Sequence, residues 1–173
     1  MKKILGIIAL SFFVSFISAQ TTVKVMDEKS QTMILVGETN IMDIKEGVFG
    51  ENFNTEYAKY RIDTTLLQQI NTYLKSNSNV IKLTIVLGTW CGDSKEQVPR
   101  FYSIYDKMTT KFADITLIGV DRLRKAGDLD ISDLKIEKVP TFIFYRDGVE
   151  IGRITETPMK TIENDMMRIL STK

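Results

Sequence analysis

A polar turn between two strongly patterned segments constrains the fold of this chain more than any other feature. Residues 83–87 have the length and composition of a buried strand, and residues 95–112 carry apolar side chains at helical spacing. Residues 88–94 between them read Gly-Thr-Trp-Cys-Gly-Asp-Ser, which is typical of a turn. The sequence therefore places Cys91, the only cysteine, where a strand ends and a helix begins.

This position favours thiol chemistry at Cys91. The first N–H groups of a helix have no partner within the helix, and their partial positive charge stabilises a thiolate. A single cysteine cannot form an internal disulfide, so its thiol is free to react with another molecule. An inert, buried cysteine is the alternative, but Trp90, Gly92 and Asp93 form a polar turn and not an apolar periodic segment.

The residues that the chain lacks exclude several mechanisms. There is no histidine, so a Cys-His or Ser-His-Asp nucleophile and a histidine-ligated metal site are excluded. One cysteine cannot form a structural zinc site. We therefore expect no metal and no cofactor. The balance of 23 basic and 22 acidic residues gives no reason to expect nucleic acid as a partner.

The chain divides into three parts. Residues 1–19 are interpreted as a secretory signal peptide, because Lys2 and Lys3 precede an apolar segment that ends at small residues. This segment is shorter than the roughly 20 residues of a membrane-spanning helix, so we expect an exported, periplasmic or secreted protein without stable membrane insertion. Residues 20–61 are interpreted as an N-terminal extension packed on the domain, and residues 62–173 as one globular domain.

The remaining patterns predict an α/β fold with a mixed sheet. Within residues 20–61, residues 23–26 and 32–36 are predicted as edge strands, the second ended by Gly37. Phe49, Phe53, Tyr57 and Tyr60 form an aromatic stripe at helical spacing, which we interpret as core packing.

The patterns are clearer after residue 62. Asp63 is predicted to cap a helix, residues 115–120 to form a buried strand, and residues 128–134 to form a short helix. A hairpin is predicted around Asp147-Gly148, and a last helix near Pro158 with Thr157 as its cap.

Several of these features together resemble the thioredoxin superfamily. The first is Trp90-Cys91-Gly92 at the strand-to-helix turn, and the second is Pro99 within the following helix, where a kink is expected. The others are Val139-Pro140-Thr141 before a strand, the hairpin, and the closing helix. The resemblance implies a thioredoxin-like fold, in which helices flank a central mixed sheet. It also implies that the Val139-Pro140 bond is cis, lies against Cys91, and has beside it backbone that pairs with a bound peptide. The extension and the string Trp-Cys-Gly-Asp-Ser are similar to exported thioredoxin-like proteins of certain bacteria.

The motif departs from the family at three positions. Ser94 stands where the family has its second cysteine, which gives a C-x-x-S motif that cannot resolve a mixed disulfide. Asp93 replaces the proline of the family motif, and its charge disfavours the thiolate, whereas Lys95 favours it. Ile85 occupies the position of the buried acid in thioredoxins.

Two functions remain open, and whether the protein is an enzyme depends on which is correct. In the first, the protein is a monothiol thiol-disulfide oxidoreductase or isomerase, in which Cys91 attacks a disulfide, Ser94 donates a hydrogen bond to the thiolate, and an external thiol resolves the intermediate. In the second, it is a catalytically degenerate module that binds extended peptide. A peroxiredoxin-like peroxidase is disfavoured, because Gly88 stands where that family has threonine.

The same residues surround Cys91 in both interpretations. The predicted binding residues are Trp90, Gly92, Asp93, Val139 and Pro140. The expected partners are protein or small-molecule disulfides and thiols, and the protein is expected to be a monomer.

Overall fold

The computed structural model describes residues 22–78 and 80–172, so the predicted signal peptide lies outside the described residues. The described strands form one six-stranded sheet in the order β1-β2-β4-β3-β5-β6. Strands β3 and β4 are parallel, and the other neighbouring pairs are antiparallel. The predicted α/β fold with a mixed sheet is therefore confirmed.

The elements follow one another along the chain in a β-β-α-α-α-β-α-β-β-β-α order, with one short 3-10 turn before β5. Their bounds are β1 (Val23–Asp27), β2 (Thr32–Thr39), α1 (Ile41–Lys45), α2 (Gly47–Lys59), α3 (Thr64–Asn77), β3 (Ile81–Leu87), α4 (Gly92–Lys107), β4 (Asp114–Gly119), η1 (Ser132–Leu134), β5 (Thr141–Arg146), β6 (Val149–Thr155) and α5 (Ile162–Leu170).

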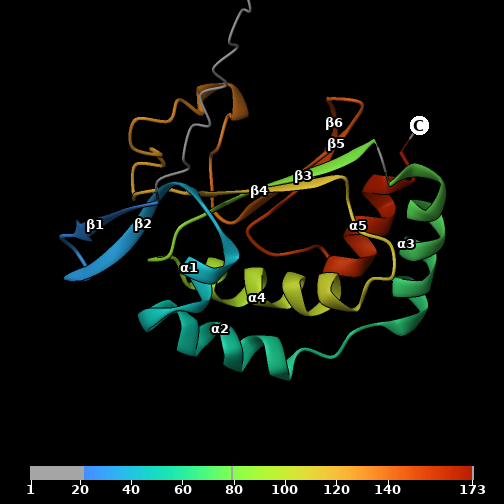
Figure 1. The fold of residues 1–173 in the computed structure, drawn as a ribbon, viewed down its shortest axis with the longest axis horizontal. Helices are drawn as coiled ribbons and strands as arrows, with labels where there is room; N and C mark the ends of the chain where they lie inside the picture. The colour runs from blue at the N-terminus through green and yellow to red at the C-terminus, as the bar shows by residue number, and fades with distance from the viewer. Residues whose placement is uncertain (1–21, 79, 173) are drawn as a thin grey trace, which may run out of the picture.

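The described helices lie on one side of the sheet, and the long connection between β4 and β5 lies on the other (Figure 1). Strand β3 shows why, because side chains alternate between the two faces of a strand. Ile81, Leu83, Ile85 and Leu87 all join the large core beneath the helices. Val86 points the other way, into a smaller apolar cluster formed with the connection between β4 and β5.

The cysteine turn joins two of the best-buried elements. Strand β3 is central in the sheet, and α4 begins five residues after the strand ends. Val98, Phe101 and Ile104 of α4 are buried, as the helical spacing predicts. The helix continues through Pro99 as a single element of 16 residues. The two ends of the turn are therefore held by the core.

Strand β2 corrects the prediction that residues 32–36 form an edge strand ended by Gly37. It lies between β1 and β4 and continues through Gly37 to Thr39. The strand can pair there because Gly37 lies opposite Gly119 and the two backbones approach closely. A Cβ atom on Gly119 would lie 2.4 Å from the Leu35 carbonyl oxygen, so only glycine fits.

The aromatic stripe of residues 49–60 lies on α2 and packs against α4. Phe49 and Phe53 are buried, and the Phe53 ring centroid is 6.0 Å from that of Tyr102 on α4. After α2, the Tyr60 hydroxyl donates to the buried Glu163 carboxylate of α5 at 2.7 Å. The stripe therefore contributes to the main core, as its spacing indicates.

Two predicted helices differ in the structure. Residues 128–134 form only the short 3-10 turn η1, and Lys135 ends it in the left-handed region at φ 49°. The last helix begins at Ile162 and not near Pro158, because the Thr161 hydroxyl, and not that of Thr157, accepts the capping hydrogen bond from Asn164 N. The predicted cap at Asp63 is confirmed, since its side chain accepts from Thr65 N and Leu66 N.

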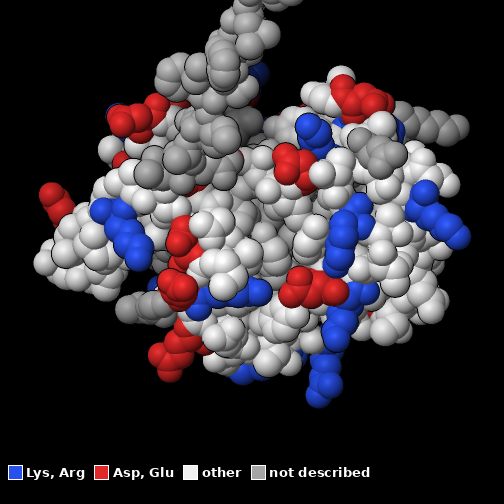
Figure 2. Space-filling view, viewed as in Figure 1, with Lys and Arg blue, Asp and Glu red and all other residues white. Residues whose placement is uncertain are grey.

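The surface carries both signs of charge. Figure 2 shows Asp and Glu side chains interspersed with Lys and Arg on the face in view. Among the described residues, no helix has the length and apolar character needed to cross a membrane.

The packing of α2 leads to a stability prediction. Phe53 is 1% exposed and contacts the rings of Tyr57 and Tyr102, so Phe53→Ala opens a cavity in the main core. We expect it to lower the free energy of unfolding by about 3–5 kcal/mol, measured by urea denaturation. Asn54→Ala, at an exposed position of the same helix, is the control and changes the value little. Equal effects of the two substitutions would show that α2 does not contribute to the core.

Candidate thiol site

The backbone places Cys91 at the first turn of α4. Cys91 N donates to Gly88 O at 2.8 Å, and Lys95 N donates to Cys91 O at 3.1 Å. Cys91 is the N-cap residue, with extended backbone angles, and its side chain makes no capping hydrogen bond. The half-buried Cys91 therefore lies at the N-terminus of α4, which is the positive end of the helix dipole.

The sulfur faces the segment before β5. The Val139-Pro140 peptide bond is cis, which confirms the prediction from the resemblance. The Cys91 thiol donates to Val139 O at 3.2 Å, and only the protonated sulfur can make this bond. Pro140 O accepts from Glu156 N at 2.7 Å, so the end of β6 supports the same segment. Cys91 and Val139 are 48 residues apart in sequence, and the hydrogen bond brings Cys91 together with the Val139-Pro140 segment.

Trp90 forms the wall beside the sulfur. Its Nε1 donates to Val120 O, just after β4, at 2.8 Å. The ring lies over Gly88, where an added Cβ atom would come within 2.7 Å of ring atom Cε2. Gly88 is therefore required by the position of the ring and not only by the turn. Gly92 is exposed, and a Cβ atom there would meet no atom within 4 Å, so that side of the sulfur is open.

Ser94 lies inward from the sulfur and is fully buried. Its Oγ accepts a hydrogen bond from Gly88 N at 3.1 Å, which closes the turn a second time. The structure thus places the serine hydroxyl under the turn and not at the surface.

Acidic and basic residues occur on two of the segments that form the site, the first turn of α4 and the segment before β5. Asp93 is in the first turn of α4, where a negative charge interacts favourably with the helix dipole. Lys138 forms an ion pair with Glu156 at 2.5 Å. The pKa of Lys138 is raised chiefly by its hydrogen bond to Glu156 and further by the charge of Asp93. Asp93 therefore faces a cation across the segment that holds Val139.

The sequence did not identify Arg122 and Asp27 as part of the site. Arg122 Nε and Nη2 each donate to Asp27 at 2.8 Å, and its guanidinium carbon lies 4.8 Å from the centre of the Trp90 ring. The charged loop that contains Arg122 was visible in the sequence, but nothing in it indicated a partner 95 residues earlier. The β1–β2 hairpin therefore reaches the wall of the site.

Thr89 makes a second link between this hairpin and the turn. Its side chain is buried, and its Oγ1 accepts from the backbone N–H of Leu35 on β2 at 3.1 Å. This bond satisfies a buried donor of the hairpin within the residues that position Cys91.

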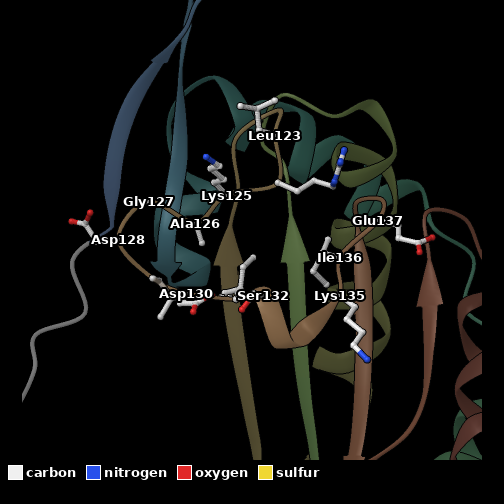
Figure 3. A pocket seen from close by; sticks show the side chains of 13 residues that line it. Leu123, Lys125, Ala126, Gly127, Asp128, Asp130, Ser132, Lys135, Ile136 and Glu137 are labelled. Carbon is white, nitrogen blue, oxygen red and sulfur yellow. Dashed lines mark hydrogen bonds between the residues drawn. The ribbon is translucent and has the colours of Figure 1, made fainter.

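The connection between β4 and β5 forms an open pocket of about 650 Å³ next to the site (Figure 3). Figure 3 shows Lys125, Ala126 and Gly127 on one side of it and Ile136 and Glu137 on the other. The lining of residues 123–137 mixes apolar and charged side chains. Ile136 also packs in the small cluster that contains Cys91, so the pocket adjoins the thiol site. Within residues 22–78 and 80–172, no three Cys, Asp or Glu side chains converge as metal ligands.

A thiol at the N-terminus of a helix, opposite a cis-proline segment on a mixed sheet, is the arrangement of thiol-disulfide exchange proteins. The family model described as Thioredoxin matches residues 63–168, and the chain belongs to this family. The predicted superfamily is therefore confirmed, and with it the general class of thiol redox proteins.

Individual relatives match part of the chain. Thioredoxin H-type 1 of Nicotiana tabacum is 24% identical over 104 residues, which are 59% of this chain and 78% of that protein. Thioredoxin of Mus musculus is 30% identical over 84 residues, 47% of this chain and 74% of that protein. The TPR repeat-containing thioredoxin TDX of Arabidopsis thaliana is 26% identical over 112 residues, 65% of this chain, and the match spans only 28% of its length.

Solved structures to which the chain is similar include Fasciola hepatica thioredoxin, with 17% identity, a TM-score of 0.40, and coverage of 61% of this chain and 93% of that chain. A poplar thioredoxin h has 17% identity and a TM-score of 0.43, and covers 65% and 94%. The relatives named above come from plants and animals, so a bacterial origin of this chain stays a prediction, as do its signal peptide and its location.

The Thr89 hydrogen bond leads to a test of the link between hairpin and turn. Thr89→Val keeps the shape of the side chain but leaves Leu35 N without its acceptor. We expect a loss of about 1–3 kcal/mol in the free energy of unfolding, measured by urea denaturation, because an unpaired buried donor is costly. Thr89→Ser keeps the acceptor and is the control. A valine variant as stable as the serine variant would contradict this role.

The Asp27–Arg122 pair predicts how stability depends on pH. The hydrogen bonds from Arg122, followed by those from Ser30, hold the pKa of Asp27 well below its usual range. The unfolded chain, with an ordinary pKa of about 3.9, therefore takes up the proton first, and this contribution to stability is present above that pH and is lost as the pH falls. We expect the stability difference between the wild type and Asp27→Asn to shrink from pH 6 to pH 2 in urea titrations. A difference that stays constant over this range would contradict the prediction.

Proposed function

We propose that this protein is a monothiol thiol-disulfide oxidoreductase or isomerase of an exported compartment, with Cys91 as its nucleophile. The observation that carries the proposal is the position of the Cys91 sulfur, at the start of α4 and 3.2 Å from Val139 O beside the cis peptide bond. Membership of the thioredoxin family supports exchange between protein thiols and disulfides in general. The monothiol character follows from the chain having one cysteine.

The reaction has two exchanges. The Cys91 thiolate attacks one sulfur of a substrate disulfide, a Cys91–substrate disulfide forms, and the other substrate sulfur leaves as a thiolate that takes up a proton. A small external thiol then attacks this mixed disulfide as its thiolate. If it attacks the substrate sulfur, Cys91 leaves as a thiolate and the substrate carries the small thiol. The external thiol is required because Ser94 has no sulfur and its oxygen lies buried under the turn.

The surrounding residues have separate roles in this proposal. Gly92 leaves one approach to the sulfur open, and Trp90 forms the opposite wall. The backbone at Val139 and Pro140 would hold an extended substrate segment, and Asp93 would contact charged groups on it. Ser94 keeps the turn closed, and its hydroxyl hydrogen would stabilise the Cys91 thiolate.

A second function, peptide binding without turnover, is favoured by one observation. The pocket of about 650 Å³ adjoins the small apolar cluster around Cys91, and it has exposed leucines, Leu123 and Leu129, among its lining residues. Such a surface suits an extended peptide bound beside the thiol, and a mixed disulfide without a resolving thiol would hold it there.

The two functions are separated by a turnover experiment. The wild type, Cys91→Ser and Ser94→Cys are incubated with a peptide disulfide, with and without excess glutathione, and followed by intact mass spectrometry and product release. We expect the wild type to form one equivalent of mixed disulfide at Cys91 without glutathione, and to resolve this adduct and turn over repeatedly only when glutathione is present. Cys91→Ser forms no adduct, and Ser94→Cys completes one turnover without glutathione, because its second thiol resolves the adduct.

The controls also define the contrary result. If Ser94→Cys turns over while the wild type forms no mixed disulfide under any condition, the fold is competent but the native site is not. The oxidoreductase proposal is then wrong, and peptide binding without a covalent bond is left. A wild-type mixed disulfide that glutathione does not resolve would also contradict the oxidoreductase proposal, and it is the result expected if the protein holds a peptide through Cys91.

A further inference from the structure

Arg122 joins three parts of the molecule that are distant in sequence. It lies in the loop after β4, its guanidinium donates twice to Asp27 at the end of β1, and its planar face lies over the ring of Trp90. Two parallel hydrogen bonds to one carboxylate fix the orientation of a guanidinium as well as its position. The guanidinium plane therefore has little freedom to leave the tryptophan.

Asp27 is itself held firmly. It is 7% exposed, and its Oδ2 also accepts from Ser30 N at 3.0 Å and from Ser30 Oγ at 2.5 Å in the turn between β1 and β2. A nearly buried carboxylate with this many donors stays ionised and in place. The hairpin turn thus anchors the arginine from one side.

Trp90 is held from the other side. Its Nε1 donates to Val120 O at the end of β4, two residues before Arg122. The ring is therefore fixed between a backbone carbonyl, the guanidinium and Gly88. The pKa of Arg122 is raised mainly by its hydrogen bond to Asp27, and the charge of Cys91 acts in the same direction. Arg122 lies over the ring of Trp90, the residue next to Cys91 in the chain, so its cation is placed at the thiol site.

We propose that Arg122 is a positioning residue of the thiol site, held by Asp27, through which the N-terminal hairpin fixes Trp90 and supplies a cation to the Cys91 thiolate. This inference deepens the proposed function and rests on it for its relevance to exchange. It gives the hairpin a role in the chemistry through the Asp27–Arg122 contact.

Several charged groups face Cys91, and a test must separate them. Asp93 and Lys95 belong to α4. Arg122 belongs to the loop after β4 and pairs with Asp27 on β1. Lys138 belongs to the segment before β5 and pairs with Glu156. Changing Arg122 leaves the α4 and Lys138 groups unaltered.

Trp90 provides a direct measurement, because it is the only tryptophan of the chain. We expect Asp27→Asn, Arg122→Lys and Arg122→Gln each to shift the fluorescence emission to longer wavelength and to increase quenching by acrylamide, since each removes the bidentate clamp on the ring. The double variant Asp27→Asn/Arg122→Gln is expected to show no further change, because the two residues act as one unit.

The alkylation rate of Cys91 by iodoacetamide, measured against pH, tests the electrostatic part. Arg122→Gln is expected to move the midpoint of the profile upward by about 0.5 pH unit or more, which slows alkylation at pH 7 roughly threefold, because an opposite charge near a thiolate favours it. Arg122→Lys keeps the charge and is expected to leave the midpoint close to that of the wild type, while its fluorescence changes.

Glu150→Gln is the matched control, because the Glu150–Arg153 pair is also bidentate, with both bonds at 2.6 Å, and lies on β6. It is expected to change neither measurement. Far-UV circular dichroism confirms folding of each variant, and the double variant replaces Arg122→Gln if an unpaired Asp27 prevents folding.

An unchanged emission in Asp27→Asn, or an unchanged midpoint when Arg122 becomes glutamine, overturns the proposal. Neither measurement needs a disulfide substrate, so a protein without turnover would refute the proposed function while leaving this role of Arg122 open to confirmation.

Discussion

The thiol site depends on Gly88, which makes three contacts that no other residue could make together. Its carbonyl accepts from Cys91 N, its N–H donates to Ser94 Oγ, and the absence of a Cβ atom leaves room for the Trp90 ring. The two hydrogen bonds close the turn between β3 and α4, and the space left by the missing Cβ atom lets the Trp90 ring form the wall of the site. Because β3 and α4 are both buried in the main core, the position of the sulfur is fixed by the packing of the whole domain.

The contact with Gly88 also explains what a serine does at position 94. In a dithiol motif the residue at this place both supports the turn and resolves the mixed disulfide. A buried hydroxyl that accepts from a backbone N–H can do the first, but an oxygen cannot do the second. Supporting the turn and resolving the mixed disulfide are thus separate requirements at this position. Ser94 supports the turn but cannot resolve the disulfide.

The sequence predicted the parts of the fold that have local causes. The strand before Cys91, the helix after it, the Asp63 cap and the Asp147-Gly148 hairpin all follow from periodicity or turn residues within a few positions. The resemblance to a known family added the cis bond at Val139-Pro140. Of the candidate site, the residues on both sides of the sulfur were identified in this way.

The contacts that the sequence did not reveal join distant segments. Arg122 and Asp27 are 95 residues apart, and Thr89 and Leu35 are 54 apart, so neither pair has a local pattern. Strand β2 was placed at an edge because its pairing with β4 depends on two glycines meeting from far apart in the chain. Residues 128–134 are apolar at positions that suit a short helix, but Ile131 and Leu134 pack against the small apolar cluster from a connection that is mostly irregular. Tertiary contacts decided each of these cases.

These long-range contacts bear on how a chain without histidine and with a single thiol can control the reactivity of that thiol. Two of the cations near Cys91 are themselves paired: Arg122 with Asp27, and Lys138 with Glu156. Paired charges nearly cancel at a distance, so the potential at the sulfur depends on which member of each pair is nearer, and not on the net charge of the site. A small movement of one pair then changes that potential more than the loss of a remote charge does. Asp27 belongs to the N-terminal hairpin and binds Arg122. The packing of that hairpin on the domain therefore affects the electrostatic potential at the thiol.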